Sequence, residues 1–287
     1  MGTYTINQKF RAVPPALADR PQSDRQVRLA EMFGIGLDET CEVTLCEGLV
    51  LDVRQGDVVF ITGPSGSGKS VLLRTLERAV RAAVPDGVQV VDLSRLLLPT
   101  DRPVIDLPSA SFETALRLFS TAGLADAMAL LRPADQLSDG QRYRLRLALA
   151  LDRLLGEGPA PAQATADEDV PAFPHQTRVR PAQTARCRAA PRRRPSGRRG
   201  VLIADEFCST LDRCCARALA YRVRRLVDRS RGDPNEHGLT VLAASAHDDL
   251  VEDLAPDVLI VKHDGEQVAV RYADPSREAS AGGEGDR

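Results

Sequence analysis

The stretch that decides the fold of this chain is Gly63-Pro64-Ser65-Gly66-Ser67-Gly68-Lys69-Ser70. It fits the pattern G-x-x-x-x-G-K-[ST], a glycine-rich loop that cradles phosphate groups. The apolar run at residues 57–61 directly before it is typical of a buried strand, and the run at residues 71–76 after it is typical of a helix. Strand, glycine-rich turn and helix, in that order, are the context that the pattern requires.

The residue types in this loop explain how it can hold a phosphate chain. Glycine takes backbone conformations that a side chain forbids, so the amides of the loop can point inward together. The start of the following helix adds the positive end of its dipole. Lys69 can reach the β- and γ-phosphates, and the hydroxyl of Ser70 can bind Mg²⁺. The sequence therefore predicts that residues 63–70 bind a nucleotide together with Mg²⁺.

Apolar runs that alternate with helical periodicity predict an α/β fold with a mostly parallel central sheet and an antiparallel β edge. Buried strands are expected at residues 57–61, 88–93, 201–204, 239–245 and 257–262. We expect a loose N-terminal arm at residues 1–40, with a short helix near 25–33, and one domain at 41–272. A short helical subdomain covers about 95–155 within that domain, and 273–287 form a disordered tail.

Composition narrows the class of protein. The 287 residues suit one large α/β domain or two small ones, and a net charge of −2 gives no global field for nucleic acid. No C-x-x-C pair and no apolar run of about 20 residues occur, so a zinc site or a membrane span is not expected. Residues 156–200 are rich in Pro, Ala and Arg and predict a disordered insert, whose basic part at 171–200 is the one hint of nucleic acid.

Polar side chains follow two further predicted strands. Asp205 and Glu206 come directly after residues 201–204, and His247 follows residues 239–245. Because parallel strands bind ligands at their carboxyl ends, these side chains should converge on the glycine-rich loop. Asp205 would then hold Mg²⁺ together with Ser70. Glu206 would polarise the attacking water, and Lys69 would complete the catalytic set. His247 would contact the γ-phosphate or hold the attacking water.

Taken together, these motifs resemble those of the ABC ATPase family, a group of P-loop NTPases. The resemblance runs from about residue 49 to 272 and is interrupted by the insert. The loop at 63–70 matches Walker A, and 201–206 match the Walker B strand with its catalytic glutamate. Residues 209–212 match the D-loop, and His247 matches the switch histidine. Residues 137–141 read Leu-Ser-Asp-Gly-Gln, a variant of the LSGGQ signature.

The resemblance implies a head-to-tail homodimer in which each ATP lies between one copy's loop and the other copy's signature. Four further nucleotide-contacting residues are then implied: Ser138, Gly140, Gln141 and Asp212. It also implies ATP hydrolysis that drives a separate partner, membrane or soluble. We expect such a protein to be cytoplasmic, or peripheral to the membrane through that partner.

Three positions depart from the family pattern. Asp139 replaces a glycine of the signature, and Phe207 follows Glu206 where proline is usual. No glutamine suits the Q-loop, so Asp106 is the candidate for its place at the metal. Phe33 is the candidate for the aromatic that stacks on adenine. The interval between Lys69 and Ser138 is shorter than in a typical transporter subunit, which favours a soluble partner.

Two other functions share part of this pattern. A P-loop kinase for small molecules would need the loop at 63–70 but neither residues 137–141 nor 209–212. A binding module that is switched by nucleotide without hydrolysis would fit the altered signature.

Overall fold

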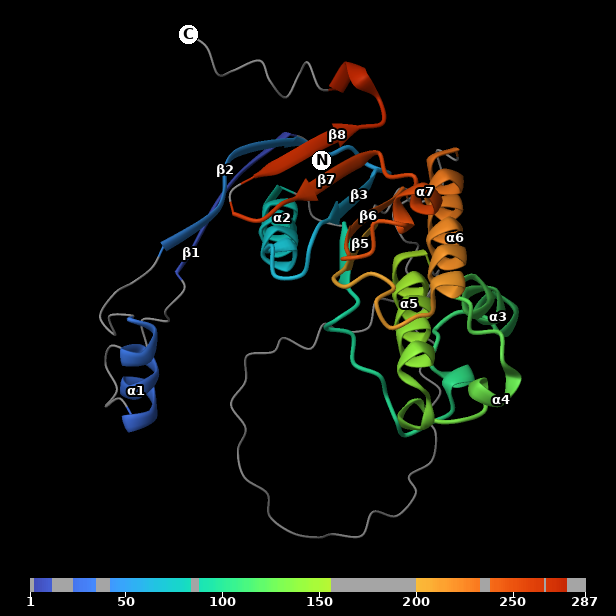
Figure 1. Ribbon diagram of the computed structural model, residues 1–287. Helices are drawn as coiled ribbons and strands as arrows, with labels where there is room; N and C mark the ends of the chain where they lie inside the picture. Colours follow the sequence, from blue (N-terminus) through green and yellow to red (C-terminus); the bar gives the residue numbers. More distant parts are fainter. Residues whose placement is uncertain are drawn as a thin grey trace.

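A six-stranded sheet forms the centre of the computed structural model, which describes residues 3–11, 23–34, 42–83, 88–155, 200–232, 238–265 and 267–277 (Figure 1). The strand order is β4-β5-β6-β3-β7-β8. Five strands run parallel, and β8 pairs with β7 in the antiparallel sense. The strands are β3 (Val58–Thr62), β4 (Gln89–Asp92), β5 (Gly200–Ala204), β6 (Leu239–Ala244), β7 (Val258–Lys262) and β8 (Val268–Tyr272). The α/β fold with its mostly parallel sheet is confirmed.

The apolar runs form central strands because both faces of the sheet are covered. Val58 and Phe60 of β3 face one hydrophobic cluster, and Val59 and Ile61 face the other. Helices α3 (Phe112–Thr121), α5 (Asp139–Leu155) and α6 (Arg213–Gly232) cover the first face. Helix α2 (Lys69–Ala83) covers the second. Each fully buried Val, Ile, Leu or Phe contributes about 1.5–3 kcal/mol, so these layers fix the strand ends firmly.

An antiparallel pair, β1 (Thr3–Arg11) and β2 (Glu42–Asp52), packs on the same face as α2 (Figure 1). Strand β1 corrects the prediction of a loose arm at residues 1–40. Tyr4 and Ile6 of β1 are buried, so the first residues alternate between buried and exposed side chains, as a strand does. The prolines that follow in the sequence favoured an irregular arm instead. The helix expected near residues 25–33 is present as α1 (Asp24–Phe33).

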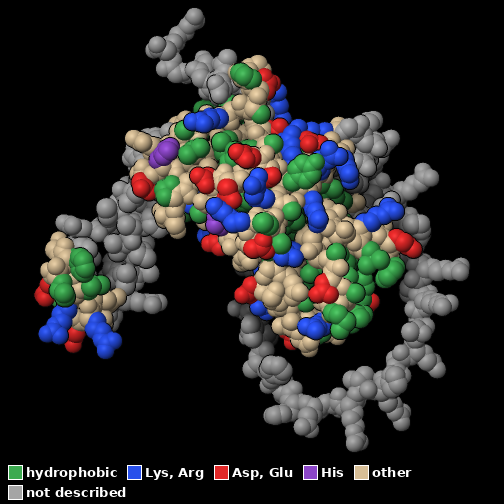
Figure 2. All heavy atoms as spheres, turned by 45° about the vertical axis from the view of Figure 1, so that its right-hand side comes forward, with side chains coloured by type: hydrophobic (Ala, Val, Ile, Leu, Met, Phe, Trp, Pro, Cys, Tyr) green, Lys and Arg blue, Asp and Glu red, His purple; other side chains and the backbone are tan. Residues whose placement is uncertain are grey.

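The helical subdomain contains α3, α5 and a four-residue helix, α4 (Ala127–Leu130), with two 3₁₀ turns, η2 (Val104–Asp106) and η3 (Ala134–Gln136). Helix α7 (Leu250–Leu254), which the sequence analysis did not predict, follows β6 and packs on α6. Acidic and basic side chains intermingle on the face shown in Figure 2. Ion pairs of this kind join α6 to its neighbours, as between Arg224 and Asp257.

The predicted insert begins where α5 ends and stops where β5 begins. The described residues on either side of it lie close together: a Cβ added to Gly200 would be 3.1 Å from Cδ2 of Leu154. Of the disordered insert predicted at residues 156–200, residues 156–199 lie outside the described residues, whereas Gly200 begins β5. The predicted tail beyond residue 277 also lies outside the described residues. Residues 275–277, which belong to that predicted tail, form a 3₁₀ turn.

Candidate nucleotide site

The glycine-rich loop joins β3 to α2 and is shaped by positive φ angles. They are 144° at Gly63, 84° at Gly66 and 95° at Gly68. A Cβ on Gly63 would lie 1.9 Å from the carbonyl oxygen of Lys262 in β7, so only glycine fits there. A Cβ on Gly66 would meet nothing within 4 Å, because this part of the loop opens into a cavity.

Lys69 is the first residue of α2, and its side chain bends back over the loop. Its Nζ donates to the carbonyl oxygens of Gly63, at 2.9 Å, and Pro64, at 2.7 Å. Partial burial lowers the pKa of Lys69, and the carboxylates of Asp205 and Glu206 oppose that shift. The ammonium group of Lys69 thus lies beside the loop, where phosphate oxygens can replace the carbonyl oxygens of Gly63 and Pro64 as its hydrogen-bond acceptors.

Ser70 and Asp205 bring two oxygen ligands to the same place. The Ser70 hydroxyl donates to Oδ1 of Asp205 at 2.8 Å, and the Glu206 amide donates to the same oxygen at 3.1 Å. This donor set fits Mg²⁺, which is usually held by one or two carboxylates together with substrate phosphates and water. Among the described residues no group of three or more His, Cys, Asp and Glu could hold a metal by itself.

His247 follows β6 and is oriented by a residue of α6. Nη1 of Arg213 lies 3.1 Å from Nδ1 of His247 and 2.9 Å from Oδ1 of Asp249. A guanidinium group only donates hydrogen bonds, so Nδ1 must accept, and the proton of the neutral ring is on Nε2. His247 therefore presents an N–H group as its free end.

These side chains surround one cavity of about 440 Å³. Its walls include Gly66, Lys69 and Ser70 from the loop and Asp205, Glu206 and His247 from the strand ends. The cavity thus brings together eight of the sixteen site residues that were predicted from the sequence, including all of those expected at the ends of β5 and β6. Gly63, Pro64 and Ser67 do not line the cavity; the first two supply the carbonyls that hold Lys69.

Ser209 and Ser245 also line the cavity, and neither was predicted from the sequence as a site residue. Ser245 comes directly after β6, so the rule that ligands bind at strand ends would have found it. Ser209 lies three residues after Glu206, within the segment that matched the D-loop.

Residues of the signature lie elsewhere, at the start of α5. The Ser138 amide donates to Oε1 of Gln141 at 3.0 Å, and the Gln141 amide donates to the Ser138 hydroxyl oxygen at 3.3 Å, which is a capping box. Asp139 pairs with Arg142 at 2.7 Å, so the variant carboxylate is partly neutralised. Ser138, Gly140 and Gln141 do not line the cavity of their own chain.

Three other predicted residues also lie outside the cavity. Asp212 accepts from the Cys215 amide at 2.9 Å, which caps α6, and hydrogen bonds from the Cys215 thiol and amide lower the pKa of Asp212. Asp106 lies in η2, and the structure does not bring it to Ser70 and Asp205. Phe33, in α1, is 69% exposed and does not line the cavity.

Comparison with known proteins gives consistent matches. The sequence model of the ABC transporter family matches residues 46–97. Aliphatic sulfonates import ATP-binding protein SsuB 2 of Rhizobium johnstonii is 31% identical over 210 residues, covering 68% of this chain and 79% of the relative. Methionine import ATP-binding protein MetN of Streptomyces coelicolor is 29% identical, covering 77% of this chain and 58% of that relative.

A solved structure shares the fold. The dimeric structure of MJ0796, a bacterial ABC transporter cassette, aligns with a TM-score of 0.50 and 15% identity, covering 82% of this chain and 93% of the cassette. At that identity the similarity concerns the fold alone. Among the described residues, no helix is both long and apolar enough to cross a membrane.

Proposed function

The chain belongs to the ABC transporter family and is an ATP-hydrolysing cassette that drives a separate partner, and from that premise we propose how its cavity performs the reaction. The triphosphate of ATP lies along the amides of residues 65–70, and Lys69 neutralises its charge. One observation supports this proposal above all others: Ser70, Asp205, Glu206 and His247 come from three separate segments and line a single cavity beside the loop.

In the proposed reaction Glu206 accepts a proton from a water molecule as the water oxygen attacks the γ-phosphorus. The bond between the γ-phosphorus and the β-bridging oxygen breaks, which releases ADP and inorganic phosphate. The Nε2–H of His247 donates to a γ-phosphate oxygen and steadies the charge that develops there. Arg213 keeps that N–H available by donating to Nδ1.

Ser70 and Asp205 are the residues that would hold Mg²⁺, which supplies positive charge beside the β- and γ-phosphates. Their 2.8 Å contact keeps both oxygens next to the loop. The fit rests on this pair, and Asp106 is not part of it.

Ser138, Gly140 and Gln141 have no role at their own chain's cavity, so the proposal assigns them to a second copy. A head-to-tail homodimer would place the start of one α5 over the nucleotide of the other copy, where a helix N-terminus suits an anion. The curated relatives are named as import ATP-binding proteins. A membrane importer is therefore the partner that their names favour, although the short helical subdomain favoured a soluble one.

The decisive experiment is the substitution Glu206→Gln. We expect phosphate release to fall by at least about a hundredfold, because the proton acceptor is lost, while ATP still binds. The trapped ATP should also shift the protein toward a dimer in light scattering.

Glu252→Gln is the matched control. Glu252 of α7 is 85% exposed and makes one long ion pair, to Arg217 at 3.9 Å. Turnover of this variant should equal that of wild type. Equal turnover of Glu206→Gln and wild type would refute the assignment of Glu206.

A further inference from the structure

The turn that follows β5 carries Glu206 in an unfavourable backbone conformation. Glu206 has a φ of 52° and Cys208 a φ of 61°, and neither residue is glycine. Each such residue favours a different local structure unless its surroundings hold it in place. Two hydrogen bonds close the turn on itself, from the Ser209 amide to the Glu206 carbonyl and from the Leu211 amide to the Cys208 carbonyl.

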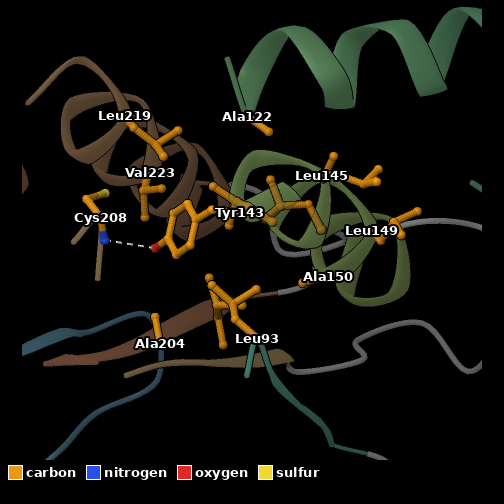
Figure 3. Packing of buried hydrophobic residues seen from close by; sticks show 14 of the residues in the cluster. Leu93, Ala122, Tyr143, Leu145, Leu149, Ala150, Ala204, Cys208, Leu219 and Val223 are labelled. Atoms are coloured by element: carbon orange, nitrogen blue, oxygen red, sulfur yellow. Dashed lines mark hydrogen bonds between the residues drawn. The ribbon is translucent and has the colours of Figure 1, made fainter. Parts of the chain in front are cut away.

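Two further bonds tie this turn to the rest of the fold. The Phe207 amide donates to the Ala244 carbonyl of β6 at 2.7 Å. The Cys208 amide donates to the hydroxyl oxygen of Tyr143 at 3.0 Å, in a buried site. Figure 3 shows the Tyr143 ring directed at the Cys208 nitrogen, with Leu219 and Val223 of α6 nearby. The second bond is made by a side-chain hydroxyl, which also hydrogen-bonds to the Cys208 side chain, so one substitution removes both polar contacts of Tyr143 with Cys208.

Tyr143 connects the turn to the helix of the signature. It lies in the first turns of α5, which begins directly after Ser138. The two segments also lie close together at Gly140, where an added Cβ would be 3.4 Å from the Thr210 carbonyl oxygen. The start of α5 and the turn that presents Glu206 and Ser209 to the cavity are therefore held together.

We propose that Tyr143 is a positioning residue for ATP hydrolysis, whose hydroxyl holds the Cys208 amide and thereby fixes the turn that carries Glu206. The proposal rests on the function proposed for Glu206. In the dimer, the same hydroxyl links the signature, which faces the partner copy's nucleotide, to the glutamate that acts on the chain's own nucleotide.

The surroundings keep this bond in one form. Burial raises the pKa of Tyr143 well above its usual value, and burial raises the pKa of Cys208 to about 12. Both groups therefore stay neutral, and the hydroxyl oxygen of Tyr143 remains a hydrogen-bond acceptor for the Cys208 amide across the working pH range.

The test is Tyr143→Phe, which keeps the ring and removes the hydroxyl. Tyr272→Phe is the matched control, because Tyr272 is also buried and its hydroxyl oxygen accepts from a backbone amide, that of Asp52, at 3.1 Å. Tyr272 lies in edge strand β8 and does not line the cavity. Steady-state ATP turnover, amide hydrogen exchange and thermal unfolding are measured for both variants.

We expect Tyr143→Phe to lower kcat by about tenfold and to leave KM for ATP within about twofold, because only the placement of Glu206 changes. Exchange of the Cys208 amide should rise on the order of tenfold. Tyr272→Phe should unfold at a similarly lowered temperature with unchanged kcat. The proposal is overturned if Tyr143→Phe keeps wild-type kcat, or if the two variants lose kcat equally.

The outcomes separate this proposal from the function beneath it. If wild type hydrolyses ATP and Glu206→Gln does not, the proposed function is upheld, whatever the result for Tyr143→Phe. A wild-type chain without turnover overturns both, and unchanged exchange at Cys208 overturns the role of Tyr143 alone.

Discussion

Replacing Gly63 by alanine tests how the loop is seated on the sheet. The added Cβ would lie 1.9 Å from the carbonyl oxygen of Lys262, about 1.5 Å short of an ordinary contact. The added Cβ is fixed to the backbone of residue 63, and the oxygen that it meets belongs to the backbone of Lys262. The neighbouring residues Thr62 and Val261 are paired in the β3–β7 ladder, so neither backbone can move easily. The clash therefore cannot be relieved by turning a side chain.

The expected cost follows from two effects. Overpacking in a closed site costs about 1–3 kcal/mol. A φ of 144°, which suits glycine alone, adds about 1–3 kcal/mol of backbone strain. We therefore expect Gly63→Ala to lose about 4 kcal/mol, a large part of the roughly 5–15 kcal/mol that stabilises a domain.

Two other glycines separate the clash from the strain. Gly66 and Gly265 have φ values of 84° and 71°, and a Cβ on either would meet nothing within 4 Å. Gly66→Ala and Gly265→Ala should each lose only about 1–2 kcal/mol. Of these two, Gly66→Ala alone should also weaken ATP binding, because its Cβ would enter the cavity that the phosphates are proposed to fill.

Urea unfolding gives the three free energies, and equilibrium binding of a fluorescent ATP analogue gives the affinities. The reasoning is refuted if Gly63→Ala is no less stable than Gly265→Ala. It also fails if Gly66→Ala binds the analogue as wild type does.

Arg213→Ala should lower the steady-state rate of ATP hydrolysis on the order of tenfold, because the His247 ring loses the hydrogen bond that orients it. Arg217→Ala, one turn further along α6, is the control and should leave that rate unchanged. Equal effects of the two substitutions would contradict the role given to Arg213. Burial disfavours the Asp257 carboxylate, but the Val58 amide, Arg231 and Arg224 outweigh that effect and hold the pKa of Asp257 below its usual value. The contribution of Asp257 to stability is thus complete above about pH 4 and is lost as pH falls through the lowered pKa. Asp257→Asn should therefore lower the free energy of unfolding by about 2 kcal/mol at pH 7. The stability of this variant should also depend less on pH in acid than that of wild type. If the free energy of unfolding falls equally steeply at acid pH in wild type and in Asp257→Asn, another carboxylate is responsible for the loss of stability.

The sequence predicted the centre of this fold well because its signals are local. Buried parallel strands read as short apolar runs, and the glycine-rich loop has a spacing that its chemistry demands. Strand β1 was missed because Tyr4 and Ile6 show their alternation over only a few residues before a proline-rich segment. Its partner β2 lies more than thirty residues along the chain, so the pairing is non-local.

The site was predictable to the extent that strand ends carry it. Asp205, Glu206 and His247 each follow a buried strand, and the rule for parallel sheets brings them together. Arg213 and Tyr143 act through other residues. No sequence pattern predicts that Arg213 contacts His247 or that Tyr143 contacts the Cys208 amide, because these contacts depend on how distant segments pack. Asp106 was chosen by its place in the chain alone, and the fold of the preceding segment takes it elsewhere.

The contact between Leu154 and Gly200 has a practical meaning for engineering this chain. Leu154 lies in the last turn of α5 and Gly200 is the first residue of β5, so both junctions of the intervening segment lie at the opposite end of β5 from Asp205, about 16 Å away along the strand. Because both junctions face away from the cavity, we expect a fluorescent reporter or an affinity tag inserted between Leu155 and Gly200 to leave the steady-state rate of ATP hydrolysis unchanged.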